Sequence, residues 1–145
     1  MHHIMYISTA TVTVNEATLK EMLVIYRRNN LRNGITGLLL YSGDQYVQLI
    51  EGEEEAVHQL FSKIENDPLH KNLLKLADGP IQQRLFHEWS MGFKTVRKED
   101  FSCFSSYIDP SKPDFLHTLQ PQYEDSAILV LQQFVQQNLS DIHYL

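Results

Sequence analysis

A single glutamine interrupts an otherwise apolar stretch of the chain. In YVQLIEG, residues 46–52, Gln48 is flanked by residues typical of a buried β-strand, and Glu51-Gly52 is expected to end that strand. A buried primary amide costs free energy unless it finds hydrogen-bond partners. Tyr6, in the opening segment MHHIMYIST, is a second polar-tipped residue among apolar neighbours. An amide both donates and accepts hydrogen bonds, and a phenol can release an electron together with a proton, so these residue types could share a hydrogen bond that is able to rearrange.

Hydrophobic periodicity indicates the elements that must position these two residues. Strands are expected at about residues 2–8, 35–41, 46–52, 73–78 and 88–96, and helices at about 15–28 and 53–67. The order β-α-β-β-α-β-β predicts an α+β fold, a ferredoxin-like sheet with two helices on one face and an additional strand. The first strand and the Gln48 strand are neighbours in such a sheet. Tyr6 and Gln48 are therefore expected side by side under the helices.

Capping residues set the expected limits of the helices. Asn15 is the expected N-cap of the first helix, Asn29-Asn30 its expected end, and the basic pair 27–28 lies in its last turn. The second helix is expected to carry the acidic run 53–55 in its first turn and to end at Pro68.

Composition changes after about residue 96, which divides the chain into residues 1–96 and an extension, residues 97–145. Three prolines punctuate a polar stretch of the extension before SAILVLQQFVQQNL, whose length and glutamine content favour a helix over a strand. The extension is too short to be a second domain. We expect it to be helical and to pack on the sheet face that the first two helices leave open.

Charge and composition exclude several classes of function. A net charge of −6 argues against nucleic acid as a partner, and no segment is long and apolar enough to span a membrane. The single cysteine, Cys103, cannot form an internal disulfide, so a cytoplasmic protein is expected. The spacing of the seven histidines and this cysteine indicates no metal site, and no pattern of a hydrolase is present. The GxxG of residues 34–37 precedes a strand, so it is not expected to hold phosphate.

From pattern alone, two interpretations of Tyr6 and Gln48 remain open. The first is a structural hydrogen bond that satisfies two buried polar groups, which the pattern favours because interior polar pairs are usually structural. The second is a functional site. Trp89 likewise is first a core aromatic residue whose indole N–H needs a partner.

Four motifs together resemble one known family. They are Tyr6 in MYIS, Asn29-Asn30 before NGITG, Gln48 in YVQLIEGE, and WSMGF at residues 89–93. In this order and spacing the motifs resemble BLUF domains, blue-light sensors that use flavin. The resemblance covers residues 1–96, and the remaining residues resemble the C-terminal extension of short, single-domain members.

The resemblance implies a flavin held between the two helices. Asn30 and its neighbour Asn29 match residues at the polar edge of the flavin ring, and Gln48 matches a glutamine between Tyr6 and the flavin. Light is implied to drive electron and proton transfer from Tyr6 through Gln48. The rearranged hydrogen bonds then slightly red-shift the flavin absorption.

Two further positions are matched by the resemblance to signal output. Trp89 and Met91 match a pair of residues in the last strand, and both are expected to share a sheet face with Phe93.

One position departs from the family pattern. A basic residue often precedes the histidine that His70 matches, and this chain has Leu69 there. His70, Lys71 and Arg32 are the candidates to replace it near the ribityl-phosphate side. The choice between FAD and FMN therefore stays open.

The expected function is that of a short blue-light photoreceptor without enzymatic activity. Its output would be a light-dependent contact with a downstream effector protein in trans, and the apolar AILVL segment favours a homo-oligomer. Two other classes remain as alternatives: a small ferredoxin-like enzyme of acylphosphatase type, and an interaction module without a ligand. The acylphosphatase type would need an arginine at the end of the first strand, where ISTATVTVN has none.

Overall fold

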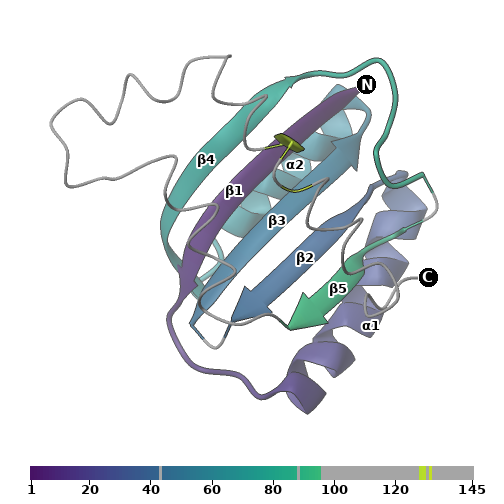
Figure 1. Ribbon diagram of the computed structural model, residues 1–145. Helices are drawn as coiled ribbons and strands as arrows, with labels where there is room; N and C mark the ends of the chain where they lie inside the picture. Colours follow the sequence, from purple (N-terminus) through teal and green to yellow (C-terminus); the bar gives the residue numbers. More distant parts are fainter. Residues whose placement is uncertain (43, 88, 96–127, 130, 132–145) are drawn as a thin grey trace, which may run out of the picture.

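The structure, a computed structural model, describes residues 1–42, 44–87, 89–95, 128–129 and 131. Its elements are β1 (His2–Ala10), α1 (Glu16–Asn33), β2 (Thr36–Ser42), β3 (Gln45–Gly52), α2 (Glu54–Glu65), β4 (His70–Pro80) and β5 (Gly92–Thr95). The five strands form one sheet in the order β4-β1-β3-β2-β5 (Figure 1). Neighbouring strands are antiparallel except β2 and β5, which are parallel. The predicted element order and ferredoxin-like fold are confirmed.

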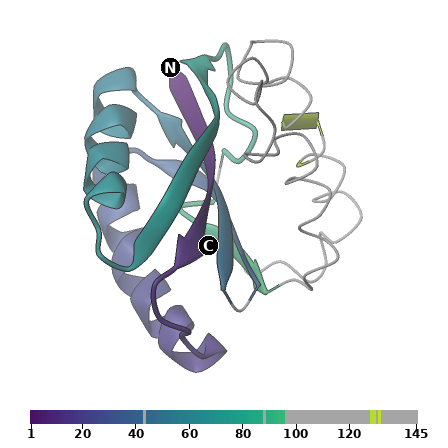
Figure 2. The ribbon, with the colours of Figure 1, turned by 90° about the vertical axis from the view of Figure 1, so that its left-hand side faces the viewer.

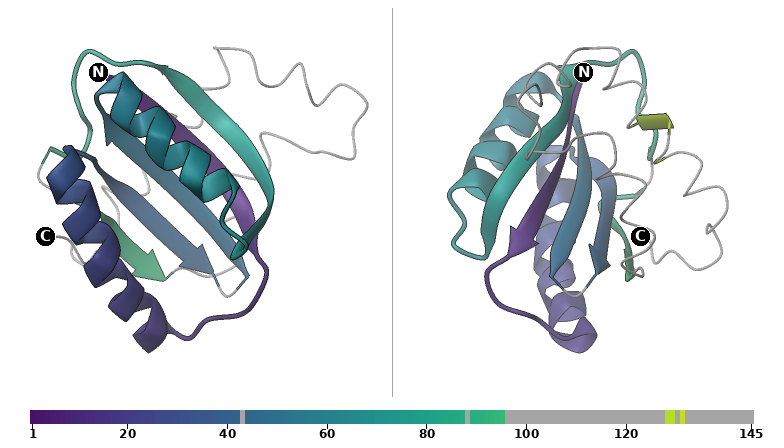
Figure 3. Two further views of the ribbon diagram at one scale, coloured as in Figure 1. Left: turned by 180° about the vertical axis from the view of Figure 1, so that it is seen from behind. Right: turned by 60° about the vertical axis from the view of Figure 1, so that its left-hand side comes forward.

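Both helices cover the same face of the sheet. Figures 2 and 3 show α1 and α2 side by side on one side of the strands. Alternation along each strand separates two apolar clusters, one on each face. The cluster under the helices contains Ile4 and Tyr6 of β1, Ile50 of β3, and Val57 and Phe61 of α2. The antiparallel strands β2 and β3 are each buried on both faces, as their continuous apolar sequences predict.

The opposite face of the sheet carries the second cluster. Met5, Leu38, Val47 and Leu49 contribute to it from the strands, and Leu131 of the C-terminal segment is buried with them. Figure 2 shows the short helical segment around Leu131 on the side of the sheet away from α1 and α2. The expected helical extension otherwise lies outside the described residues.

The first helix is longer than the sequence predicts. Asn15 is the N-cap, and its side chain accepts a hydrogen bond from the backbone of Thr18. The expected end at Asn29-Asn30 is wrong, because α1 continues to Asn33. Gly34 ends the helix with a left-handed φ of 69°, a conformation that glycine adopts at low cost.

The limits of α2, β4 and β5 also differ from those predicted from the sequence. The second helix ends at Glu65, with Asn66 as its C-cap, before Pro68 is reached. The fourth strand extends beyond the expected residues 73–78 at both ends, whereas β5 begins only at Gly92. None of the helices among the described residues has the length and apolar character needed to cross a membrane.

Glu51 is the penultimate residue of β3 and is fully buried. The strand continues to Gly52, and Glu51 is 0% exposed. Its carboxylate accepts hydrogen bonds from the backbone N–H groups of Leu85, at 2.7 Å, and Phe86, at 2.9 Å. The strand ends at Glu51-Gly52 as predicted, and these donors from the loop after β4 satisfy a carboxylate that would otherwise be excluded from a core.

Glu51 is expected to make stability depend on pH. Burial raises its pKa above the ordinary value of 4.5, and the two backbone hydrogen bonds only partly oppose this. The folded state therefore holds the proton more tightly than the unfolded state. This contribution to stability is fully present below pH 4.5 and is lost as pH rises through the raised pKa.

Comparison with Glu51→Gln isolates this contribution. We expect the free energy of unfolding of the wild type, relative to that of Glu51→Gln, to fall as pH rises above 4.5. Urea denaturation between acidic and neutral pH measures the difference. A relative stability that is flat or rises with pH would contradict the assignment.

Candidate functional site

A cavity of about 470 Å³ lies between the two helices and the sheet. This volume is within the range of small-molecule sites. Its walls come from α1, the start of β2 and β3, α2, and the loop that leads into β4. The lining residues are Leu19, Met22, Tyr26, Asn29, Asn30, Arg32, Asn33, Ile35, Leu39, Tyr46, Gln48, Ala56, Gln59, Leu60, Lys63, Ile64, Asp67, Leu69 and His70. Each helix contributes both apolar and polar side chains to the lining.

Tyr6 and Gln48 lie opposite each other on adjacent strands. The register of β1 and β3 pairs them directly. The Tyr6 hydroxyl donates a hydrogen bond to Oε1 of Gln48. Tyr6 is fully buried, whereas half-buried Gln48 lines the cavity. Tyr6 and Gln48 thus lie side by side under the helices, as the strand order predicts.

The other end of the Gln48 amide faces Met91. Its Nε2 lies 3.5 Å from the Met91 sulfur, a weak acceptor. Met91 is 0% exposed and belongs to the cluster under the helices. The three residues thus form a chain of contacts from β1 through β3 to the residue that precedes β5.

The surroundings of Tyr6 keep its phenol protonated. Its ring makes edge contacts with Phe61, at a centroid distance of 5.7 Å, and with His70, at 6.2 Å. Burial raises the pKa of Tyr6 well above its ordinary value. Burial also lowers the pKa of His70, although Asp67 acts in the opposite direction. The Nδ1 of His70 lies 2.8 Å from the hydroxyl of Ser8, so this half-buried ring is held in place.

Asn30 joins the cavity to the segment before β5. Its side chain is buried, and Nδ2 donates to the backbone oxygen of Ser90 at 2.8 Å. Arg27, one turn earlier on α1, donates from Nε to the backbone oxygen of Met91 at 2.7 Å. Sequence reasoning placed Arg27 in the last turn of a shorter helix and missed this role. Its i, i+3 spacing from Asn30 was the available signal.

Polar and charged groups frame the opening of the cavity. Asn29 and Arg32 line it from α1, and Lys63 lines it from α2. Lys71, a sequence candidate for the same region, is exposed on β4 and does not line the cavity. Lys63 was missed, although it is the basic residue in the last turn of α2. The structure therefore brings Arg32 and Lys63, rather than Lys71, to the cavity.

Trp89 lies on the other side of the sheet from Met91. Its indole stacks on Phe86 at a centroid distance of 4.9 Å and packs against the cluster opposite the helices. Met91 and Phe93 belong to the cluster under the helices. The expectation that all three share a face is wrong, because regular strand alternation begins only at Gly92.

Comparison with known proteins identifies the family of this arrangement. The family described as "BLUF: Sensors of blue-light using FAD" matches residues 1–92. The chain is 37% identical over 93 residues to photoactivated adenylate cyclase subunit alpha of Euglena gracilis, in an alignment that covers 63% of this chain and 9% of that protein. It is 30% identical over 118 residues to the blue light- and temperature-regulated antirepressor BluF of Escherichia coli (strain K12), covering 81% of this chain and 28% of that protein.

A solved structure supports the same assignment. The dark-state structure of BlrB, a BLUF protein, has a TM-score of 0.61 and 32% identity, and the match covers 86% of this chain and 96% of that one. The chain spans well under two thirds of the length of the two curated relatives. The match to residues 1–92 covers more than half of the chain, which therefore belongs to the BLUF family of blue-light sensors that use FAD.

Proposed function

We propose that the cavity between α1 and α2 holds the flavin and that Tyr6 and Gln48 form the light-responsive switch beside it. The observation that carries this proposal is the hydrogen bond from Tyr6 to a glutamine that itself lines the cavity. A purely structural Tyr–Gln pair would not require its amide to face a cavity.

The chemistry of the lining residues fits a flavin. Apolar side chains of the two helices, among them Met22 and Leu60, suit the faces of a flat aromatic ring. Asn30 retains Oδ1 and one N–H beyond its bond to Ser90, which suits the polar edge of the ring. Arg32 and Lys63 supply positive charge for a phosphate at the opening. Phosphate is common to FAD and FMN, so these residues serve either.

The residues of the switch have complementary tasks. A bound oxidised flavin supplies blue-light absorption and accepts an electron. Tyr6 holds a proton on its hydroxyl in the dark and passes it toward Gln48 Oε1 when its ring loses an electron. Gln48 can then rotate or tautomerise, which changes the group that it presents to the cavity. Met91 contacts the amide nitrogen and is therefore placed to respond to that change.

The proposed output is a change in contact with another protein. The backbone at Ser90 and Met91 is tied to α1 by Asn30 and Arg27, so a shift of Met91 would reach the surface near α1 and β5. We propose that this surface, together with residues 97–145 on the open sheet face, meets a downstream effector in trans, and that the protein is a cytoplasmic homo-oligomer without enzymatic activity. Burial of Leu131 against the sheet supports the placement of the extension.

A dark-minus-lit absorption spectrum tests the proposed function. We expect the purified protein to carry oxidised flavin and to show a small red shift under blue light that reverses in the dark. Flavin without a shift would overturn the switch, and failure to take up added flavin would overturn the site. Arg32→Gln with Lys63→Gln, compared with Lys71→Gln, is expected to weaken FMN binding by about tenfold, since two exposed ion pairs with the phosphate at about 0.7 kcal/mol each contribute about 1.4 kcal/mol.

A further inference from the structure

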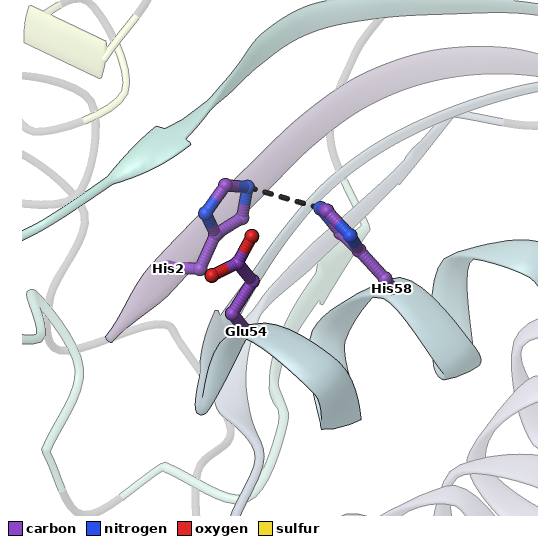
Figure 4. A group of neighbouring side chains, drawn as sticks. All are labelled: His2, Glu54 and His58. Atoms are coloured by element: carbon purple, nitrogen blue, oxygen red, sulfur yellow. Dashed lines mark hydrogen bonds between the residues drawn. The ribbon is translucent and has the colours of Figure 1, made fainter.

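A second group of polar side chains converges at the opposite end of α2 from Lys63. His2 begins β1, whereas Glu54 and His58 lie four residues apart on one face of α2. Figure 4 shows the three side chains pointing toward one another from these two elements. One ligand atom from each lies within 4.8 Å of the others. Asp78 of β4 reaches the same histidines from the side.

The distances among these atoms resemble those around a metal ion. His2 Nε2 and His58 Nε2 are 3.2 Å apart, and His58 Nε2 is 3.5 Å from Asp78 Oδ1. Bonds of about 2.0–2.1 Å in a tetrahedral site separate the ligand atoms by roughly 3.3 Å. The third pair, His2 Nε2 and Asp78 Oδ1, is closer at 2.5 Å. Binding of an ion would therefore require these two atoms to move apart.

Hydrogen bonds alone cannot satisfy all of the contacts among these three atoms. Each neutral imidazole carries one proton on one of its two nitrogens. Three atoms with lone pairs, two nitrogens and one carboxylate oxygen, point to the same small space. The protons available there cannot give every one of these contacts a donor and an acceptor while both rings are neutral. A cation at the centre would accept electron pairs from all of them.

The net charge of this group of side chains, and the hydrogen bond that holds Asp78 in place, also suit a cation. The two carboxylate oxygens of Asp78 lie against His2 on one side and Lys75 on the other. Lys75 Nζ holds the outer oxygen of Asp78 at 2.6 Å, which leaves the other oxygen directed at the histidines. Glu54 and Asp78 against Lys75 leave a net negative charge. Ligands held by outer partners in this way bind metals more tightly.

We propose that His2, His58, Asp78 and Glu54 form a binding site for a divalent transition-metal ion of the zinc class. Two imidazoles and two carboxylates are a ligand set that Zn²⁺ accepts. The ion would link the first half of α2 to β1 and β4. It would thereby also stabilise one wall of the cavity, which α2 forms. Spacing along the sequence did not indicate this site, because its ligands come from three separate elements.

Zinc titration of the full-length protein tests the site. The flavin-loaded protein is stripped with a chelator in the dark and titrated with ZnCl₂ by calorimetry. We expect binding of one ion at this site, and a loss of affinity of at least about tenfold in His58→Gln. The matched control is His87→Gln, an exposed histidine on the loop before β5, which should bind as the wild type does.

Cobalt gives a readout of geometry. Co²⁺ in the wild type should show the d–d bands of a tetrahedral complex, at wavelengths longer than those absorbed by flavin, and these bands should disappear in His58→Gln. His58 and Glu54 are exposed, so their variants should fold and retain flavin. No zinc binding, or binding that His58→Gln leaves unchanged, would overturn the proposal. Neither result would bear on the light response, which is measured separately.

Discussion

Replacement of Tyr6 with phenylalanine is expected to abolish the light-induced red shift while flavin stays bound. A phenyl ring fills the same volume and keeps the edge contact with Phe61, so the cavity walls should not change. Only the hydroxyl that donates to Gln48 is lost. The free energy of unfolding should fall by only about 1 kcal/mol, the usual net value of one hydrogen bond. The measurement is the dark-minus-lit spectrum of the variant.

Tyr41→Phe is the matched control for this experiment. Tyr41 is also a buried tyrosine, and its hydroxyl bonds the backbone of Val14 rather than Gln48. Its removal should cost similar stability and leave the red shift intact. A red shift that persists in Tyr6→Phe at wild-type amplitude would contradict the proposed switch. Its loss in both variants would indicate a general effect of weakened packing.

Gly37→Ala is expected to have the largest effect on stability. A Cβ atom at this position of β2 would lie 1.9 Å from the backbone oxygen of Leu49 in β3. That oxygen cannot move away without disturbing the β2–β3 ladder, in which Gly37 is paired with Ile50. We expect a loss of more than about 3 kcal/mol, beyond the usual cost of overpacking. Chemical denaturation, or the yield of folded protein, measures it.

Gly34→Ala provides the comparison within the same sequence motif. Gly34 has a left-handed φ, but a Cβ there would meet nothing within 4 Å. Its replacement should therefore cost only about 1 kcal/mol, the conformational preference of glycine at a helix end. Equal losses in the two variants would show that crowding against Leu49 is not the dominant effect. Glycine is thus favoured at position 37 by crowding against Leu49, and at position 34 by the left-handed backbone conformation.

The part of the fold that follows from side-chain alternation could be predicted from sequence. The faces of β1 and the pairing of Tyr6 with Gln48 depend only on strand period and element order. The N-cap at Asn15 is also a local property, and the structure confirms it. The candidate residues Asn29 and Arg32 line the same cavity as Gln48, because α1 continues past its expected end to Asn33.

Features that depend on irregular segments or distant elements could not be predicted. Trp89 precedes the first residue of β5, so strand alternation does not determine its side. The burial of Glu51 could not be predicted because its partners, the backbone N–H groups of Leu85 and Phe86, lie far along the chain. Lys63 lines the cavity because α2 packs beside α1 on the same face of the sheet. Each of these three features depends on contacts between elements that are distant in the sequence, and local sequence patterns do not indicate such contacts.

The interior position of β1 in the sheet affects folding during synthesis. This strand precedes every other element of the domain, yet it lies between β3 and β4 in the finished sheet. At about 5–20 residues per second, a ribosome needs on the order of several seconds to reach β4 after β1. Until β3 is made both edges of this apolar strand lack their partners, and the edge that pairs with β4 lacks its partner for longer. An unpaired strand edge can pair with the wrong segment. Early synthesis of β1 therefore exposes the nascent chain to wrong strand pairing until β3 and β4 follow.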